Sequence, residues 1–261
     1  MKLKLLATIL FSILFFCLLN PTVFAQGYKI RTIVIDPGHG GRKPGASGRI
    51  STEKDVALKI GLKLGARLKE ELPALKIIYT RTKDVDVDLY RRAEIANEAD
   101  ADLFISIHCN SMPAGNKHIK GVETLVAGSH RLKEQDAAIR ENADIKLEKD
   151  YKSKYDGYDP NNPSSFIILS LLKNTFRDKS IKFAKLIQNN YVGMNDRQSR
   201  GVKEQGVLVL QRCGMPAVLT EVGFISNTEE EKYINSSKGQ DEIVDAIIKA
   251  IKTYKKNVEV K

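Results

Sequence analysis

The sequence predicts one α/β domain with a mostly parallel central sheet and helices on both of its faces. Short β-branched apolar runs alternate with amphipathic stretches along the first half of the chain, which is the pattern of strand-helix-strand units. Helices that alternate with strands in this way imply a largely parallel, buried sheet. The 261 residues also suffice for one large domain with a sizeable core.

The first half of the chain supplies three strands and two helices in alternation. The predicted strands are residues 32–35, 77–80 and 103–107, and the predicted helices are residues 56–68 and 89–99. Within the first helix, Val56, Ile60, Leu64 and Leu68 recur every four residues. This spacing puts them on one helical face, which can cover a sheet.

The second half begins with a predicted strand at residues 122–126 and then changes in character. Residues 131–158 are dense in Lys, Glu and Asp and contain few large apolar side chains, so we expect a polar insertion of helix and loop at about residues 131–160. Helical spacing resumes afterwards. The remaining predicted elements are helices at 164–176, 181–192 and 241–254 and strands at 207–210 and 217–220.

The first 25 residues have the three parts of an export signal. Lys2 and Lys4 precede an apolar run over residues 5–19, and Val23 and Ala25 are the small residues that a cut after Ala25 requires. A membrane anchor is the alternative, but the run is shorter than the roughly 20 residues that span a bilayer. The sequence therefore predicts a signal peptide at 1–25, an exported mature domain at 26–261, and no membrane association after cleavage.

Polar side chains that can do chemistry follow three of the predicted strands. His39 lies in a glycine-rich turn after the first strand, His108 follows Ile107, and Glu221 follows Thr220. The carboxyl ends of parallel strands form the edge of a sheet where distant residues converge and ligands bind. Glu53 opens the helix, which we expect to begin near Lys54, and first-turn side chains point back toward the preceding loop. All four side chains are therefore expected near one another.

Two imidazoles and a carboxylate form a common catalytic zinc site, in which water takes the fourth position. A further carboxylate near the metal can take the proton of that water and pass it to a leaving nitrogen, and Glu221 is our candidate. Each residue also has a simpler reading, since a single His after a strand is more often hydrogen-bonded than metal-bound. Taken together, His39, His108 and Glu53 favour a site for one Zn²⁺.

These motifs resemble one known family, the zinc-dependent N-acetylmuramoyl-L-alanine amidases of the amidase 3 type. The resemblance covers nearly the whole mature chain. Four segments carry it: VIDPGHGG at 34–41, TEKDVAL at 52–58, ISIHCNS at 105–111 and EVGFISN at 221–227. Alanine is commoner in the family where Cys109 stands. The resemblance implies a sheet of about six strands flanked by helices.

The resemblance also implies roles for individual residues. His39, Glu53 and His108 would bind zinc, Glu221 would be the catalytic carboxylate, and Asn110 is a candidate for substrate contact. The implied reaction is hydrolysis of the amide bond between N-acetylmuramic acid and L-alanine in peptidoglycan, in a periplasmic, monomeric enzyme. Two alternatives stay open: a zinc peptidase or deacetylase that acts on another cell-wall bond, and a peptidoglycan-binding protein without activity.

The polar insertion is similar to one in Gram-negative members of the family. There, a helix of the insertion can cover the metal site until an activator protein with a LytM-type domain displaces it. By this resemblance Glu141 or Glu148 would approach the zinc and block catalysis. The simpler alternative is a surface loop with no regulatory role.

Charge and cysteine content limit the partners. The chain has a formal charge of +10, and loss of Lys2 and Lys4 with the signal leaves +8. A basic surface suits an anionic partner. Nucleic acid is a poor candidate for an exported protein, whereas carboxylate-rich peptidoglycan fits. After cleavage only Cys109 and Cys213 remain, and we expect two buried free thiols rather than one disulfide.

Overall fold

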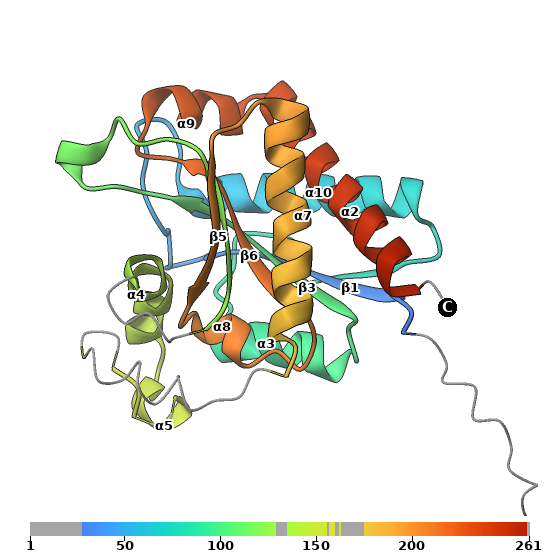
Figure 1. Cartoon of the computed structure of the whole chain (residues 1–261). Helices are drawn as coiled ribbons and strands as arrows, with labels where there is room; N and C mark the ends of the chain where they lie inside the picture. Colours follow the sequence, from blue (N-terminus) through green and yellow to red (C-terminus); the bar gives the residue numbers. More distant parts are fainter. Residues whose placement is uncertain (1–27, 129–134, 156, 160–161, 163–174, 260–261) are drawn as a thin grey trace, which may run out of the picture.

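Six strands form one sheet in the order β2-β1-β3-β6-β4-β5 (Figure 1). The computed structural model describes residues 28–128, 135–155, 157–159, 162 and 175–259. Apolar residues make up most of the first half of β1 and of β3, and both strands are buried along almost their whole length. The strands are β1 (Thr32–Pro37), β2 (Lys76–Tyr79), β3 (Leu103–Asn110), β4 (Val122–Ala127), β5 (Ser199–Gln205) and β6 (Ala217–Phe224).

The strand directions give the sheet two unequal parts. Strands β2, β1, β3 and β6 run parallel to one another, and β4 pairs with β6 in the antiparallel direction. The edge strand β5 is parallel to β4. The predicted sheet of about six strands, mostly parallel, is therefore confirmed. The reversal at β4 brings the start of that strand, rather than its end, beside the carboxyl end of β6.

Helices cover both faces of the sheet, as predicted. Alternate residues of each strand point to opposite faces, so Ile33, Ile105 and Ile107 join one apolar cluster while Val34 and Phe104 join another. The first cluster lies under α2 (Glu53–Glu71), α7 (Arg177–Asn195) and α10 (Ser237–Glu259), and the second under α3 (Leu89–Glu98) and α8 (Leu208–Gln211) (Figure 1).

The polar insertion forms short helical elements beside the second face. These are α4 (Asp136–Asn142), the 3₁₀ helix η3 (Ala143–Leu147) and α5 (Tyr151–Lys154). Ala137, Ala138, Ile145, Tyr155 and Tyr158 join the second apolar cluster, which packs the insertion against the domain. Among the described residues of the expected insertion, the structure therefore has more helix than loop.

Sequence reasoning was wrong at one strand and missed other elements. Residues 207–210 were expected as a strand, but Leu208–Gln211 is the short helix α8. A run of four apolar residues is too short to distinguish the period of a strand from that of a helix. The strand β5 was missed because its sequence, SRGVKEQ, is polar and does not alternate. The helix α9 (Thr228–Asn235) was also not predicted.

The expected helix at 164–176 lies, except for its last two residues, outside the described part of the chain, as does the predicted signal peptide.

The two cysteines of the domain are free thiols and are buried, as expected. Cys109 belongs to the apolar cluster under α2, α7 and α10. Cys213 belongs to the cluster on the opposite face of the sheet. The sheet therefore separates the two sulfur atoms.

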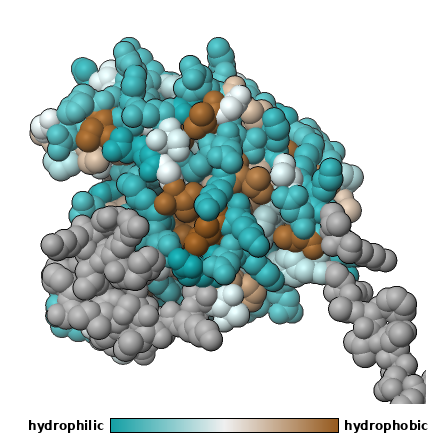
Figure 2. Space-filling view, viewed as in Figure 1, coloured by the Kyte–Doolittle hydropathy of each residue, from teal (hydrophilic) through white to brown (hydrophobic). Residues whose placement is uncertain are grey.

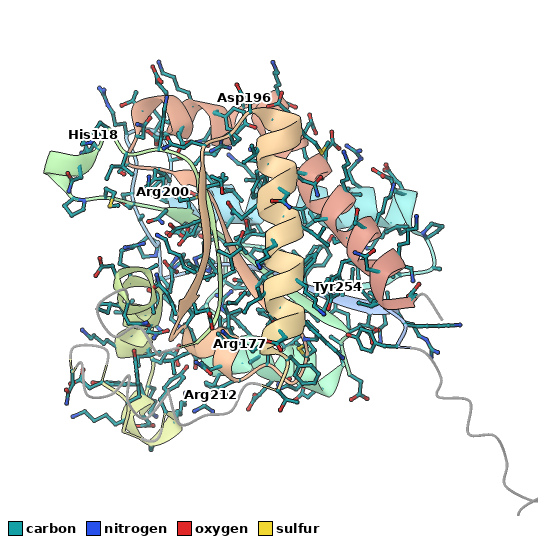
Figure 3. The ribbon with its side chains drawn as sticks, in the orientation of Figure 1. His118, Arg177, Asp196, Arg200, Arg212 and Tyr254 are labelled. Atoms are coloured by element: carbon teal, nitrogen blue, oxygen red, sulfur yellow. The ribbon has the colours of Figure 1, made fainter. Side chains whose placement is uncertain are left out.

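Hydrophilic residues cover much of one face of the molecule. The face in Figure 2 shows apolar residues in separate patches among hydrophilic ones. Within the described residues, no helix has the length and apolar character needed to cross a membrane. His118 is exposed on the loop between β3 and β4, well away from the carboxyl end of β1 (Figure 3).

Candidate metal centre

The parallel strands β1, β3 and β6 bring their predicted site residues to one edge of the sheet. Pro37 of β1 is in register with Ile107 of β3, and His108 of β3 is in register with Glu221 of β6. His39 follows two residues after β1, in a left-handed backbone conformation with φ of 56°. The turn passes very close to β3, because a Cβ atom on Gly38 would lie 2.3 Å from His108 Nε2. Only glycine fits there.

Glu53 reaches the same edge from the first turn of α2. Its Oε2 accepts a hydrogen bond from the Ala46 amide at 2.8 Å. Its Oε1 accepts one from the Cys109 amide at 2.9 Å and lies 2.9 Å from His108 Nδ1. The carboxylate is therefore fixed between the loop that precedes α2 and the carboxyl end of β3.

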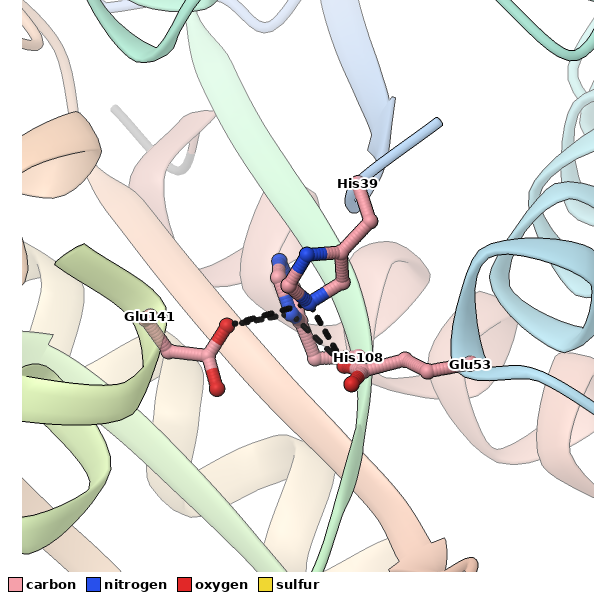
Figure 4. A group of neighbouring side chains, drawn as sticks. All are labelled: His39, Glu53, His108 and Glu141. Carbon is pink, nitrogen blue, oxygen red and sulfur yellow. Dashed lines mark hydrogen bonds and ion pairs between the residues drawn. The ribbon is translucent and has the colours of Figure 1, made fainter. Parts of the chain in front are cut away.

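Four buried side chains converge here (Figure 4): His39, Glu53, His108 and Glu141. One ligand atom from each lies within 4.8 Å of the others. His39 Nε2 is 3.1 Å from Glu53 Oε1 and 3.4 Å from Glu141 Oε2. Glu141 Oε2 is in turn 2.7 Å from His108 Nδ1. The structure thus brings together the three predicted metal ligands and one of the two carboxylates predicted in the insertion.

The arrangement of these atoms fits a metal ion. His39 Nε2 and Glu141 Oε2 are buried and make no hydrogen bond of acceptable geometry, although both have polar neighbours within 3.4 Å. Buried polar atoms in proteins are normally paired, so two unpaired ones in one cluster require an explanation. Four donor atoms within 4.8 Å of one another, as around a shared cation, provide it. Nitrogen and oxygen donors of this kind suit zinc and neighbouring transition metals.

Mutual electrostatics dominate the ionisation of the cluster. Burial alone would lower the pKa of His108, but Glu141 and Glu53 raise it to about 10. Burial alone would likewise raise the pKa of Glu141, but His108 lowers it to about 2. The same opposition raises the pKa of His39, chiefly through Glu53, and lowers that of Glu53, chiefly through His39. The two carboxylates thus favour positive charge at this point, either on the imidazoles or on a bound cation.

Glu221 stands beside the cluster. It is fully buried, and neither carboxylate oxygen has a hydrogen-bond partner. Burial raises the pKa of Glu221 well above its ordinary value, and the nearby Glu141 and Glu53 raise it further. A raised pKa makes the carboxylate a stronger base, which can take up a proton from a neighbour and return it.

Asn110 lies farther along β3, at the edge of a hollow of about 280 Å³. Its amide nitrogen donates to Glu123 Oε1 at 2.7 Å, and its oxygen accepts from the Arg140 guanidinium at 2.6 Å. Lys203 also lines the hollow and forms an ion pair with Glu123 at 2.5 Å. Asn110 therefore lies two residues after His108, at a hollow that charged side chains of β4, β5 and α4 help to line.

The insertion contributes to the centre in a way that the sequence did not reveal. Asp144 Oδ2 lies 2.7 Å from His39 Nδ1, so it orients the imidazole whose other nitrogen faces the cluster. Asp144 was not among the expected residues. Nothing in the sequence marks it, because it lies in a polar segment with no strand or motif beside it.

Glu148 does not join the cluster. It accepts hydrogen bonds from Lys43 Nζ at 2.9 Å, from the Leu89 amide at 3.0 Å and from the Tyr155 hydroxyl at 2.7 Å. Lys43 is itself buried. Glu148 thus ties the insertion to the turn after His39 and to the start of α3, at a distance from the candidate metal.

A second buried network holds the turn after β1. Asp36 accepts hydrogen bonds from Arg92 and Thr80 at 2.6 Å each and from Ser106 at 2.7 Å. Arg92 also donates to the backbone oxygens of Pro37 and His39. Burial alone would raise the pKa of Asp36, but Arg92 and the two hydroxyl groups lower it. This network fixes the backbone that presents His39.

Comparison with known proteins places the chain in a family. The family model described as N-acetylmuramoyl-L-alanine amidase matches residues 33–253. The N-acetylmuramoyl-L-alanine amidase AmiC of Escherichia coli O6:H1 is 31% identical over 224 residues, which are 85% of this chain and 52% of that protein. The chain thus spans about half the length of AmiC. AmiA of Salmonella typhimurium is 28% identical, and the match covers 90% of this chain and 79% of AmiA.

A solved structure has a similar fold. The crystal structure of N-acetylmuramoyl-L-alanine amidase from Clostridium difficile 630 is similar with a TM-score of 0.65 and 28% identity, covering 87% of this chain and 97% of that one. The family match runs from β1 to α10 and so includes every strand of the sheet and all four segments that carry the candidate site. The chain belongs to the amidase 3 family of N-acetylmuramoyl-L-alanine amidases.

Proposed function

We propose that this protein hydrolyses the amide bond between N-acetylmuramic acid and L-alanine in peptidoglycan, with one zinc ion held by His39, Glu53 and His108. One observation carries the proposal. In a chain of the amidase 3 family, buried nitrogen and oxygen ligands from β3, α2 and the turn after β1 lie within 4.8 Å of one another, and two atoms of the cluster lack hydrogen bonds.

A zinc ion at this position would lower the pKa of a water molecule toward neutrality and polarise the carbonyl group under attack. The protein's own residues supply the proton transfers. Glu221 takes a proton from the attacking water and delivers it to the nitrogen of L-alanine, which then leaves as an amine. Asp144 holds His39 in the orientation that directs Nε2 at the metal. Asn110 contacts the substrate from the neighbouring hollow.

In this conformation of the protein, Glu141 would block access of water and substrate to the metal. Its Oε2 occupies the side of the cluster opposite Glu53, where substrate and water would need access (Figure 4). The insertion therefore acts as a lid that supplies a fourth ligand in place of water. A partner of the LytM type that displaces α4 would activate the enzyme. Glu148 contributes indirectly, by anchoring the lid through Lys43.

The remaining parts of the proposal concern the location of the enzyme. Residues 1–25 direct export and are removed after Ala25, and the mature domain, residues 26–261, acts as a monomer in the periplasm on peptidoglycan. Amino-terminal sequencing of the exported protein should begin at Gln26. A mature protein that still carries Lys2 and Lys4 would contradict this part.

Zinc content and product chemistry test the reaction. Elemental analysis should give about one equivalent of zinc for the wild type and almost none for His39→Ala or His108→Ala. Digestion of purified sacculi should release stem peptides with a free L-alanine amino group and leave glycan that bears the lactyl group. Products cut at another bond would favour the peptidase or deacetylase alternative. Full activity after complete metal removal would overturn the zinc mechanism.

A further inference from the structure

The helix α9 has two buried carboxylates in its first turn. Asn227 begins this helix, because its side-chain oxygen accepts hydrogen bonds from the Glu229 and Glu230 amides. Three glutamates follow, of which Glu229 is exposed whereas Glu230 and Glu231 are 7% and 2% exposed. Buried carboxylates are costly unless they are hydrogen-bonded. The partners of these two therefore show what each holds in place.

Glu231 holds the loop that precedes Glu53. Its two oxygens accept hydrogen bonds from three consecutive backbone amides, those of residues 49, 50 and 51, at 2.9, 2.8 and 3.0 Å. The Ser51 hydroxyl donates a fourth at 3.1 Å. The fit is close, since a Cβ atom on Gly48 would lie 2.0 Å from Glu231 Oε1. One turn later on α9, Asn235 donates to Ser51 Oγ at 2.8 Å.

The same loop, residues 44–52, contacts Glu53 at its other end. The Ala46 amide donates to Glu53 Oε2 at 2.8 Å, and the Glu53 amide donates to the Ala46 carbonyl at 2.9 Å. A Cβ atom on Gly45 would lie 2.6 Å from Glu53 Oε2, so the backbone presses directly against the carboxylate. The loop therefore restrains the outer oxygen of Glu53 and leaves Oε1 directed at His39 and His108.

We propose that Glu231 is a positioning residue for the metal centre, which fixes the direction of Glu53 through the 44–52 loop. The inference rests on the proposed function of Glu53 as a metal ligand. Groups that orient a metal ligand are worth about 10- to 100-fold in metal affinity or activity. Glu231 acts indirectly. It accepts four hydrogen bonds from the 44–52 loop, and the backbone of that loop in turn restrains Glu53 Oε2.

Glu230 offers a matched control on the same turn. It is also buried and accepts hydrogen bonds from the Gly121 and Phe224 amides and from Arg197. Gly121 precedes β4, Phe224 ends β6 and Arg197 lies between α7 and β5. None of them belongs to the 44–52 loop. Glu230→Gln and Glu231→Gln should therefore both lower stability, but only Glu231→Gln should disturb Glu53.

The experiment measures metal binding rather than turnover. Zinc affinity is determined by competition with a chromophoric chelator, and the absorption spectrum of the cobalt-substituted protein reports ligand geometry. We expect Glu231→Gln to weaken zinc binding about 10- to 100-fold and to alter the cobalt spectrum. Glu230→Gln should leave both unchanged. Wild-type affinity and spectrum in a folded Glu231→Gln protein would overturn the inference, as would an equal loss of affinity in Glu230→Gln.

Two further measurements cover a Glu231→Gln variant that does not fold and a wild type that binds no zinc. If Glu231→Gln does not fold, Ser51→Ala removes one of the four donors and should weaken zinc binding about threefold, the worth of one modest hydrogen bond; an unchanged affinity in Ser51→Ala would overturn the inference. If the wild type itself binds no zinc, the proposed function fails. A wild type that binds zinc beside an unaffected Glu231→Gln variant refutes only the role of Glu231.

Discussion

The candidate centre is assembled from two regions that are built differently. His39, His108, Glu53 and Glu221 come from the sheet edge and α2, whose backbones are fixed by strand pairing and by the first apolar cluster. Glu141 and Asp144 come from the insertion, whose α4 and η3 have seven and five residues. Helices this short have little stability of their own and depend on tertiary contacts.

The insertion is held to the domain by apolar packing and by side-chain hydrogen bonds. Besides its apolar residues, side-chain hydrogen bonds tie it to the domain, among them Asn142 to Gly206 and Leu208, and Glu148 to Lys43. Each such bond contributes about 0.5–3 kcal/mol net, because the same groups bond to water when they are exposed. The comparison teaches that three candidate ligands lie on the sheet edge and α2, whereas the fourth, Glu141, lies on a short helix that depends on tertiary packing.

The largest effect is expected at Glu221, at the sheet edge. Glu221→Gln should lower kcat about 10²- to 10⁴-fold, because the amide cannot accept and return a proton. Zinc content should stay at about one equivalent, since Glu221 is not a proposed ligand. Steady-state kinetics on sacculi and elemental analysis check this. A variant that retains turnover would remove Glu221 from the mechanism.

The next effect concerns the network beneath His39. Asp36→Ala should lower the free energy of unfolding by about 3–5 kcal/mol, because it leaves Arg92 buried without its carboxylate. The folded pKa of Asp36 is lowered. Its stabilisation is therefore complete above the unfolded pKa of about 4 and is lost as pH falls through the folded value. Denaturant titrations should show the two proteins converging in strongly acidic solution, and a constant difference would contradict this assignment.

A smaller and more local effect is expected in the insertion. Glu148→Gln keeps the shape of the side chain but loses the charge that pairs with Lys43. It should destabilise the insertion by about 1.5–3 kcal/mol, the worth of hydrogen bonds to a charged group. Hydrogen exchange should accelerate at amides of Asp136–Leu147 and stay unchanged in β3 and β6. Equal acceleration in β3 would mean that the two regions unfold as one.

The smallest effect distinguishes Glu141 from Asp144, the two carboxylates that the insertion places at the cluster. Glu141→Ala should raise the rate of sacculus hydrolysis about tenfold, as expected for a modest shift in the population of a closed state. Asp144→Ala should lower the rate instead, because His39 loses the partner that orients it. Opposite signs from residues three positions apart would identify Glu141 as the blocking group. A decrease in both variants would contradict a lid.

Much of the sheet edge could be predicted from the sequence, because His39 comes soon after β1 and His108 and Glu221 lie in the second halves of β3 and β6. His39, His108 and Glu221 end or follow β-branched runs, and the parallel pattern fixes the edge at which they meet. Helix α2 was recognisable from four apolar residues at a spacing of four. Strand β5 was not, since an exposed edge strand has no need of apolar alternation.

The supporting residues could not be predicted, for a physical reason. Asp144, Glu231 and Asp36 act through contacts 44 to 182 positions away along the chain, and none of them has a local pattern that names its partner. Whether Glu141 or Glu148 would face the metal also could not be decided. Both are glutamates in one polar segment, and only the packing of α4 and α5 against the domain distinguishes them.

The position of the two cysteines has a consequence for how the chain can mature. Cys109 neighbours His108 in sequence, yet its thiol lies in the layer under α2 while Cys213 lies in the layer under α3. Burial raises the pKa of both thiols, so both remain protonated and unreactive toward oxidants. A disulfide between them would have to pass through the sheet, so the described fold forms without a covalent bond between its two apolar layers.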